Sequence, residues 1–100
     1  MRAPYTQPPQ SPTLAARVTE PQTGRVLEVL TDDLGLQLYT ASMLDGSLIG
    51  KSGTPYRKHR ALCLECQGHP DGTRWPEFGD ILVYPEKPQR RTTIYAFSAR

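Results

Sequence analysis

No stretch of ten or more residues in this 100-residue chain carries the hydrophobic period of an amphipathic helix. Short runs with a period of two take its place. Apolar and polar residues alternate from Leu36 to Thr40, and the turn signal Asp32-Asp33-Leu34-Gly35 precedes that run. Period-two runs between glycine- and proline-containing turns are typical of β-strands. The sequence therefore predicts an all-β fold of about five strands, which we expect to be antiparallel.

The same pattern places the individual strands. It begins near Leu14, and we expect strands at residues 25–31, 36–40, 62–67, 80–84 and 91–98. The last two are expected to form a hairpin around a long turn at residues 85–90. Residues 1–13 are rich in proline, glutamine and serine without an apolar period, which predicts a disordered N-terminal tail. Residues 14–100 are then expected to form the folded part.

Composition and charge narrow the functional classes. Hydrophobic residues make up 37% of the chain, below the ~45–50% usual for a globular domain, which indicates a long disordered segment or a piece of a larger domain. The net charge is +2 with both signs interspersed, so no nucleic-acid footprint is expected. No apolar run approaches a membrane span, and the N-terminus lacks a signal peptide's apolar stretch. We therefore expect a soluble cytoplasmic protein without a membrane or protein partner.

The run Leu62-Cys63-Leu64-Glu65-Cys66-Gln67 places a carboxylate inside a short, mostly apolar strand. Because strand side chains alternate, Glu65 and Gln67 share one face, and Gln37 and Tyr39 form a similar polar pair. If the two strands are neighbours, these groups converge into a set that suits hydroxyl-rich ligands such as sugars, with Trp75 as a further aromatic wall. The alternative interpretation is a solvated strand glutamate with aromatic residues in ordinary packing.

A second possible function is a metal or redox site. The sequence contains the spacing H-x3-C-x2-C-x2-H, formed by His59, Cys63, Cys66 and His69. Cysteine and histidine side chains can bind zinc. However, Cys63 and Cys66 are three residues apart, so an extended strand directs their sulfurs to opposite faces. No glycine or proline between them supplies a turn, and no helix start follows for a thioredoxin-like pair. The sequence therefore favours a site without metal.

Several ordered motifs from about Ala16 to Ser98 resemble the C-terminal part of the aldose 1-epimerase (galactose mutarotase) family. The strongest is Cys63-Leu64-Glu65-Cys66-Gln67 followed by Pro70-Asp71. The other matching segments are Thr23 to Val29, Gly35 to Thr40, Leu44-Asp45-Gly46, Gly50-Lys51, Tyr56 to His59 and Arg91 to Phe97. Departures include Cys66 in place of the usual threonine and Ser42 where asparagine is common.

The resemblance implies that residues 14–100 are the C-terminal portion of a large antiparallel β-sandwich that interconverts α and β anomers of aldohexoses such as galactose and glucose, without a cofactor. It implies that Glu65 is the general base and that Gln37 binds the sugar. The family's general-acid histidine lies upstream of the matched segment, and His59 and His69 fall at other positions. We therefore expect this chain to be inactive alone. The competing hypothesis is a non-catalytic carbohydrate-binding β module.

Overall fold

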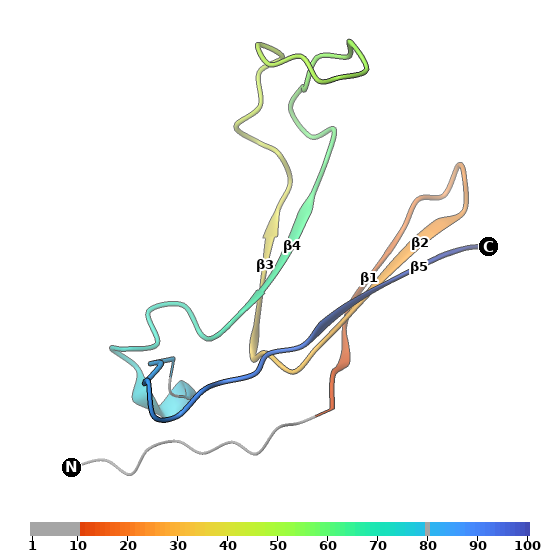
Figure 1. Ribbon diagram of the computed structural model, residues 1–100. Coiled ribbons are helices and arrows are strands. Elements are labelled where there is room, and N and C mark those ends of the chain that lie inside the picture. The colour runs from red at the N-terminus through yellow and green to blue at the C-terminus, as the bar shows by residue number, and fades with distance from the viewer. Residues whose placement is uncertain (1–10, 80) are drawn as a thin grey trace.

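The computed structural model describes residues 11–79 and 81–100, and the chain in this part is built from strands. Its elements are β1 (Thr13–Thr19), β2 (Arg25–Thr31), β3 (Gly35–Tyr39), β4 (Cys63–Gln67), the 3₁₀ helix η1 (Pro76–Phe78) and β5 (Thr93–Ala99) (Figure 1). Every strand pairing is antiparallel, so the all-β prediction is confirmed. Most of the predicted tail, residues 1–13, lies outside the described residues, and β1 begins at Thr13. None of the described helices could cross a bilayer.

The larger sheet has three strands in the order β1-β2-β5. β2 lies in the middle because its valines face both sides of the sheet, and Val26 and Val29 are buried. β1 pairs with β2 through the tight turn that follows Glu20, with one irregularity in register between Leu14 and Ala16. Arg17 and Glu28 face each other across this pair and form an ion pair of 2.8 Å.

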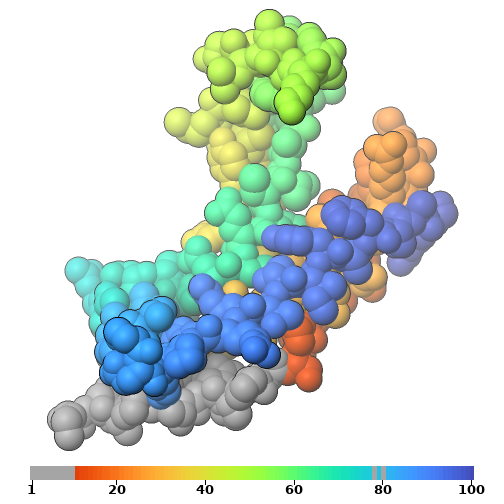
Figure 2. Space-filling model, in the orientation of Figure 1, coloured from red at the N-terminus to blue at the C-terminus, as the bar shows by residue number. Residues whose placement is uncertain are grey.

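β3 and β4 form a separate two-stranded ribbon, joined by a long loop over residues 40–62. The ribbon rises steeply from the three-stranded sheet, and its loop stands clear at the far end (Figures 1 and 2). Backbone hydrogen bonds within the loop, such as Tyr56 N–H to the Leu48 carbonyl at 2.8 Å, hold it in shape. The loop therefore brings two strands that are distant in sequence into one register.

The predicted hairpin between residues 80–84 and 91–98 is wrong. β5 pairs instead with β2 along its whole length, from Thr31 opposite Thr93 to Arg25 opposite Ala99. The chain turns early, because Tyr84 bridges Lys87. Pro85 and Pro88 then remove backbone donors that a longer ladder would need. Residue 80 lies outside the described residues.

Little of the apolar surface is buried within the described residues. The buried hydrophobic residues there are Val26, Val29 and Ala41, while Phe97 is 78% exposed. By strand alternation, the leucines of the ribbon lie on the face opposite Gln37 and Glu65. They do not form a packed side, since Leu38 is 61% exposed and Leu62 42%. A two-stranded ribbon has too little material to cover its own apolar face. The strands are therefore formed, but their apolar faces are largely open.

Candidate functional site

Gln37 and Glu65 lie directly opposite each other on β3 and β4. Side chains of directly opposed residues in an antiparallel pair leave the same face, about 4.5–5.5 Å apart at Cβ. The prediction that the carboxylate and the carboxamide share one surface is thus confirmed. Both residues are exposed, so this face is open to a ligand from solvent. A carboxylate held on a paired strand has its backbone fixed by the ladder, which is what a general base requires.

The register extends this polar face to both sides of the central pair. Tyr39 lies opposite Cys63, and Gly35 lies opposite Gln67. We call the surface formed by Gln37, Tyr39, Cys63, Glu65 and Gln67 the ribbon polar face. It offers a carboxylate, two carboxamides and a phenol, all groups that bind hydroxyls.

Tyr39 and Trp75 differ in their relation to this face. The Tyr39 hydroxyl accepts a hydrogen bond of 3.2 Å from the Met43 backbone N–H, which ties the ring to the start of the long loop. Trp75 lies outside the ribbon, just before η1, and is 46% exposed. Of the two aromatic residues considered for a sugar-binding wall, the ribbon register places Tyr39 beside Gln37 and Glu65.

The cysteines divide between the two faces of β4. Cys63 is on the ribbon polar face, whereas Cys66 lies opposite Leu36 on the apolar face. Within the part of the chain that the structure describes, no three His, Cys, Asp or Glu side chains are grouped to hold a metal ion. The spacing of His59, Cys63, Cys66 and His69 is therefore not brought together into a four-ligand site.

Both histidines lie outside the ribbon strands. His59 Nδ1 is 2.9 Å from the Thr40 carbonyl, and because a carbonyl only accepts, this nitrogen carries the proton. The His59 backbone has a φ of 61°, and its N–H donates to the Ala41 carbonyl. His59 therefore closes the base of the loop between β3 and β4. His69 follows β4, and its Nδ1 is 3.1 Å from the Pro70 carbonyl.

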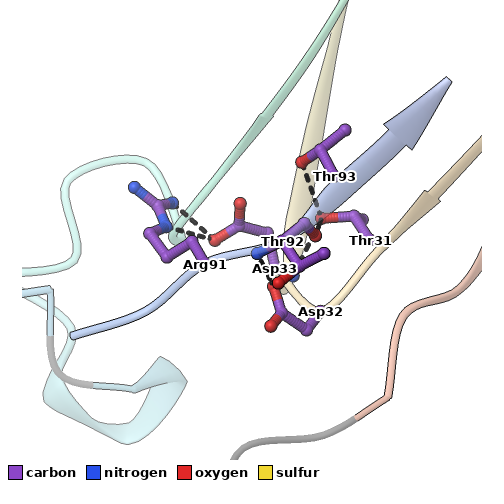
Figure 3. Close-up of polar contacts among 6 residues, drawn as sticks. All are labelled: Thr31, Asp32, Asp33, Arg91, Thr92 and Thr93. Carbon is purple, nitrogen blue, oxygen red and sulfur yellow. Dashed lines mark hydrogen bonds and ion pairs between the residues drawn. The ribbon is translucent and has the colours of Figure 1, made fainter.

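A polar cluster joins the turn before β3 to the start of β5 (Figure 3). Arg91 Nε donates to Oδ1 of Asp33 at 2.7 Å, and the Thr92 N–H donates to Oδ1 of Asp32 at 2.9 Å. The buried Thr31 hydroxyl donates to the Thr92 carbonyl and accepts from the Asp33 N–H. We call these five residues, Thr31, Asp32, Asp33, Arg91 and Thr92, the β2–β5 clasp. It fixes where the chain leaves the three-stranded sheet and enters the ribbon.

Tyr95 forms a second link between the sheet and the ribbon. Its hydroxyl donates to the Leu64 carbonyl at 3.3 Å, at the residue immediately before Glu65. Tyr95 lies on β5, at one side of the three-stranded sheet, opposite Val29 of the central strand β2. Two polar links, one at the base of β3 and one on β4, therefore hold the ribbon polar face relative to that sheet.

Comparison with known proteins identifies the family of this chain. The sequence model of the aldose 1-epimerase family matches residues 2–96. The chain belongs to the aldose 1-epimerase family. It is 47% identical over 83 residues to galactose mutarotase from Rattus norvegicus and 46% identical to that from Homo sapiens, a match that covers 83% of this chain. The chain spans only 24% of the length of these relatives, and it resembles their C-terminal part.

Sequence reasoning missed the β2–β5 clasp and the Tyr95 link in this aldose 1-epimerase segment. The sequence pattern predicts only a turn at Asp32 and Asp33, and only the start of a strand at Arg91 to Thr93. The paired acidic residues in the turn and the isolated Arg91 before Thr92-Thr93 were the available signals. These signals indicate a contact only once the β2–β5 register is known, because that register places positions about sixty residues apart side by side.

Proposed function

We propose that this chain supplies the general-base strand of an aldose 1-epimerase site, with Glu65 as the base and Gln37 as the group that orients the sugar. The observation that carries the proposal is the register that places Gln37 opposite Glu65 on an exposed face of the ribbon. One residue accepts a proton, and the other offers both a donor and an acceptor to neighbouring hydroxyls. Family membership supports the same assignment.

The proposed reaction moves two protons around one sugar ring. Glu65 accepts the proton of the anomeric hydroxyl while the C1–O5 bond breaks and O1 becomes the aldehyde oxygen. The ring oxygen takes a proton from a general acid, which the family resemblance identifies as a histidine of the preceding part of the domain. Rotation about C1–C2 presents the other face of the aldehyde. The reverse steps return both protons, so the reaction consumes nothing and yields the other anomer.

Aldohexoses are the proposed substrates, with galactose first because the relatives are named galactose mutarotase. Tyr39, half-buried beside Gln37, supplies a ring against which the apolar side of a pyranose can pack. A cytoplasmic location stays a prediction.

We further propose that the 100-residue chain alone raises the rate of anomerisation little above that of buffer. One positioned proton transfer supplies roughly 10²–10⁴-fold, and the reaction needs an acid and a base on opposite sides of the same ring. His59 and His69 are held at loop carbonyls outside the ribbon. Glu65 therefore needs an acid from elsewhere in the domain.

Polarimetry of freshly dissolved α-galactose tests this function. With the chain alone, the optical rotation should change at the rate seen in buffer. With a full-length aldose 1-epimerase that carries this segment, the rotation should reach its equilibrium value much faster. Rapid anomerisation by the chain alone would contradict the proposed division of acid and base. Sugar binding by the full-length protein without any anomerisation would instead support the carbohydrate-binding module.

A further inference from the structure

The hydroxyl of Tyr95 bonds the peptide unit that leads directly into Glu65. It donates to the carbonyl oxygen of Leu64 at 3.3 Å, and the carbon of that carbonyl is joined to the Glu65 nitrogen. Because a peptide unit is planar, the Leu64 carbonyl, the Glu65 N–H and the Glu65 Cα move together. A hydrogen bond to this oxygen therefore limits the rotation that would carry the Glu65 side chain away from Gln37.

Tyr95 reaches this carbonyl from a firmly held position in the three-stranded sheet. It lies directly opposite Val29, so the two side chains leave the same face of the sheet. Val29 is fully buried, with an exposed fraction of 0%, and β5 pairs with β2 along its whole length. The Tyr95 hydroxyl therefore connects the best-packed part of the sheet to the backbone of β4.

β4 has few other contacts that fix its position. Within the described residues, it pairs with β3 alone, and a two-stranded ribbon is marginally stable by itself. Leu64 is half-buried and Glu65 is exposed, so packing contributes little at the base. A hydrogen bond of ordinary net strength shifts an equilibrium between two conformations roughly 2- to 12-fold. One bond is therefore enough to change how often Glu65 is in place.

The two strands of the ribbon are fixed by different contacts. β3, which carries Gln37, follows the β2–β5 clasp, in which Arg91 bonds Asp33. β4, which carries Glu65, receives the hydrogen bond from Tyr95. Loss of the Tyr95 hydroxyl should therefore displace the proposed base more than the proposed sugar-binding carboxamide.

We propose that Tyr95 is a positioning residue for the general base. Its hydroxyl holds the Leu64 carbonyl so that the Glu65 carboxylate stays on the ribbon polar face, within reach of the anomeric hydroxyl. Tyr95 contacts neither the sugar nor the moving protons, and it acts on the rate through the backbone of β4. The rate responds steeply to such positioning, since a displacement of about 1 Å can cost about 100-fold. The inference rests on the proposed function of Glu65.

Tyr95→Phe tests the proposal in a full-length aldose 1-epimerase that carries this segment. The substitution keeps the ring beside Val29 and removes only the hydroxyl. Polarimetry at several α-galactose concentrations should show kcat reduced about 3- to 12-fold, with KM changed less than about twofold. Tyr84→Phe is the matched control and should change neither constant, because Tyr84 lies in the turn before β5 and is 38% exposed.

The Glu65→Gln background separates positioning from a general loss of folded protein. With no base left to position, adding Tyr95→Phe should lower the residual rate no further, whereas a merely structural role would lower it by the same factor as in the wild type. An unchanged kcat in Tyr95→Phe, or an equal loss in the Glu65→Gln background, overturns the positioning role and leaves the proposed function standing. Full activity of Glu65→Gln alone overturns the proposed function, and the positioning role with it.

Nuclear magnetic resonance of the isotope-labelled 100-residue chain tests the same contact without any activity. The carbonyl carbon signal of Leu64 and the amide signal of Glu65 should shift in Tyr95→Phe, because that carbonyl loses its donor. Both signals should stay in place in Tyr84→Phe. If the Leu64 carbonyl signal is the same in Tyr95→Phe as in the wild type, the hydroxyl does not hold this peptide unit and the inference is overturned.

Discussion

Arg91 holds the carboxylate of Asp33 across a sequence separation of 58 residues, with its Nη2 2.5 Å from Oδ1. The Asp33 side chain is only 10% exposed, whereas that of Arg91 is 51% exposed. This ion pair joins the entrance of the ribbon to the entrance of β5, so the position of the proposed site depends on a contact far from Glu65 in sequence.

A double-mutant cycle measures the strength of this contact. Asp33→Asn, Arg91→Gln and the double variant should give a coupling of about 0.5–1.5 kcal/mol, because one partner is largely shielded from water and the hydrogen bonds are charge-assisted. Urea unfolding followed by circular dichroism provides the free energies. The Arg17–Glu28 pair is the matched comparison: its side chains are 47% and 32% exposed, and its coupling should be smaller. Equal couplings would show that Asp33 and Arg91 form an ordinary surface ion pair.

Glu65→Gln should remove most turnover in a full-length protein that carries this segment while leaving sugar affinity nearly unchanged. The amide keeps the shape of the side chain but cannot take a proton, so kcat should fall about 10²–10⁴-fold. Polarimetry measures the rate, and calorimetry measures the affinity. Glu86→Gln is the control, since Glu86 lies on the exposed turn before β5. Full activity of Glu65→Gln would mean that Glu65 is a solvated strand residue.

Gln37→Ala should act mainly on binding. Loss of the carboxamide leaves a ligand hydroxyl unpaired, which costs about 1–3 kcal/mol and raises KM roughly 5- to 150-fold with little change in kcat. Rates measured at several galactose concentrations give KM and kcat separately. Gln22→Ala, in the exposed turn between β1 and β2, should change neither quantity. A fall in kcat alone would place Gln37 in the proton transfer instead.

Gly24→Ala should destabilise the protein more than Gly53→Ala. Both glycines have positive φ, 74° and 78°, so both substitutions carry the left-handed backbone cost of roughly 1–2 kcal/mol. At Gly24 the new methyl group would also collide with the carbonyl oxygen of Arg100, whereas nothing lies within 4 Å of it at Gly53. Thermal unfolding of the two variants isolates the steric part, and equal melting temperatures would contradict the close approach of the turn to the end of β5.

Acid should weaken the turn between β1 and β2. The Thr23 hydroxyl, followed by the backbone N–H groups of Gln22 and Thr23, holds the pKa of Glu20 below its ordinary value of 4.5. Because the folded pKa is the lower one, this stabilisation is complete above the unfolded pKa and is lost as the pH falls through the folded pKa.

Thr23→Ala tests this pH dependence. It removes the largest cause of the depressed pKa, so stability should fall less steeply as the solution is acidified below about pH 4.5. The two backbone hydrogen bonds remain, so part of the slope should persist. Unfolding free energies measured at a series of pH values give the slope, with Ser52→Ala in the exposed loop as the control. If the slope of the unfolding free energy against pH is unchanged in Thr23→Ala, the hydrogen bond from Thr23 to Glu20 does not contribute to the loss of stability in acid.

The sequence by itself determined four of the strands, β2 to β5, and the residues on each of their faces, whereas the strand predicted up to residue 84 is absent from residues 81–84 and β1 was not given bounds. Period-two alternation settles which side chains share a face, so Glu65 with Gln67 and Gln37 with Tyr39 were identified before any pairing was known. The motifs around Cys63 to Gln67 also pointed to the correct family. These features are local, because they depend on backbone geometry over a few residues.

Only the tertiary structure decided which strands pair. β5 joins β2 rather than residues 81–84, and the loop over residues 40–62 sets the register that brings Gln37 to Glu65. Strand pairing depends on edge hydrogen bonds and on apolar surface contributed by residues far apart in the chain, and a local pattern contains neither. The same reason explains why the β2–β5 clasp and the Tyr95 link, both of which join distant segments, became visible only in the folded chain.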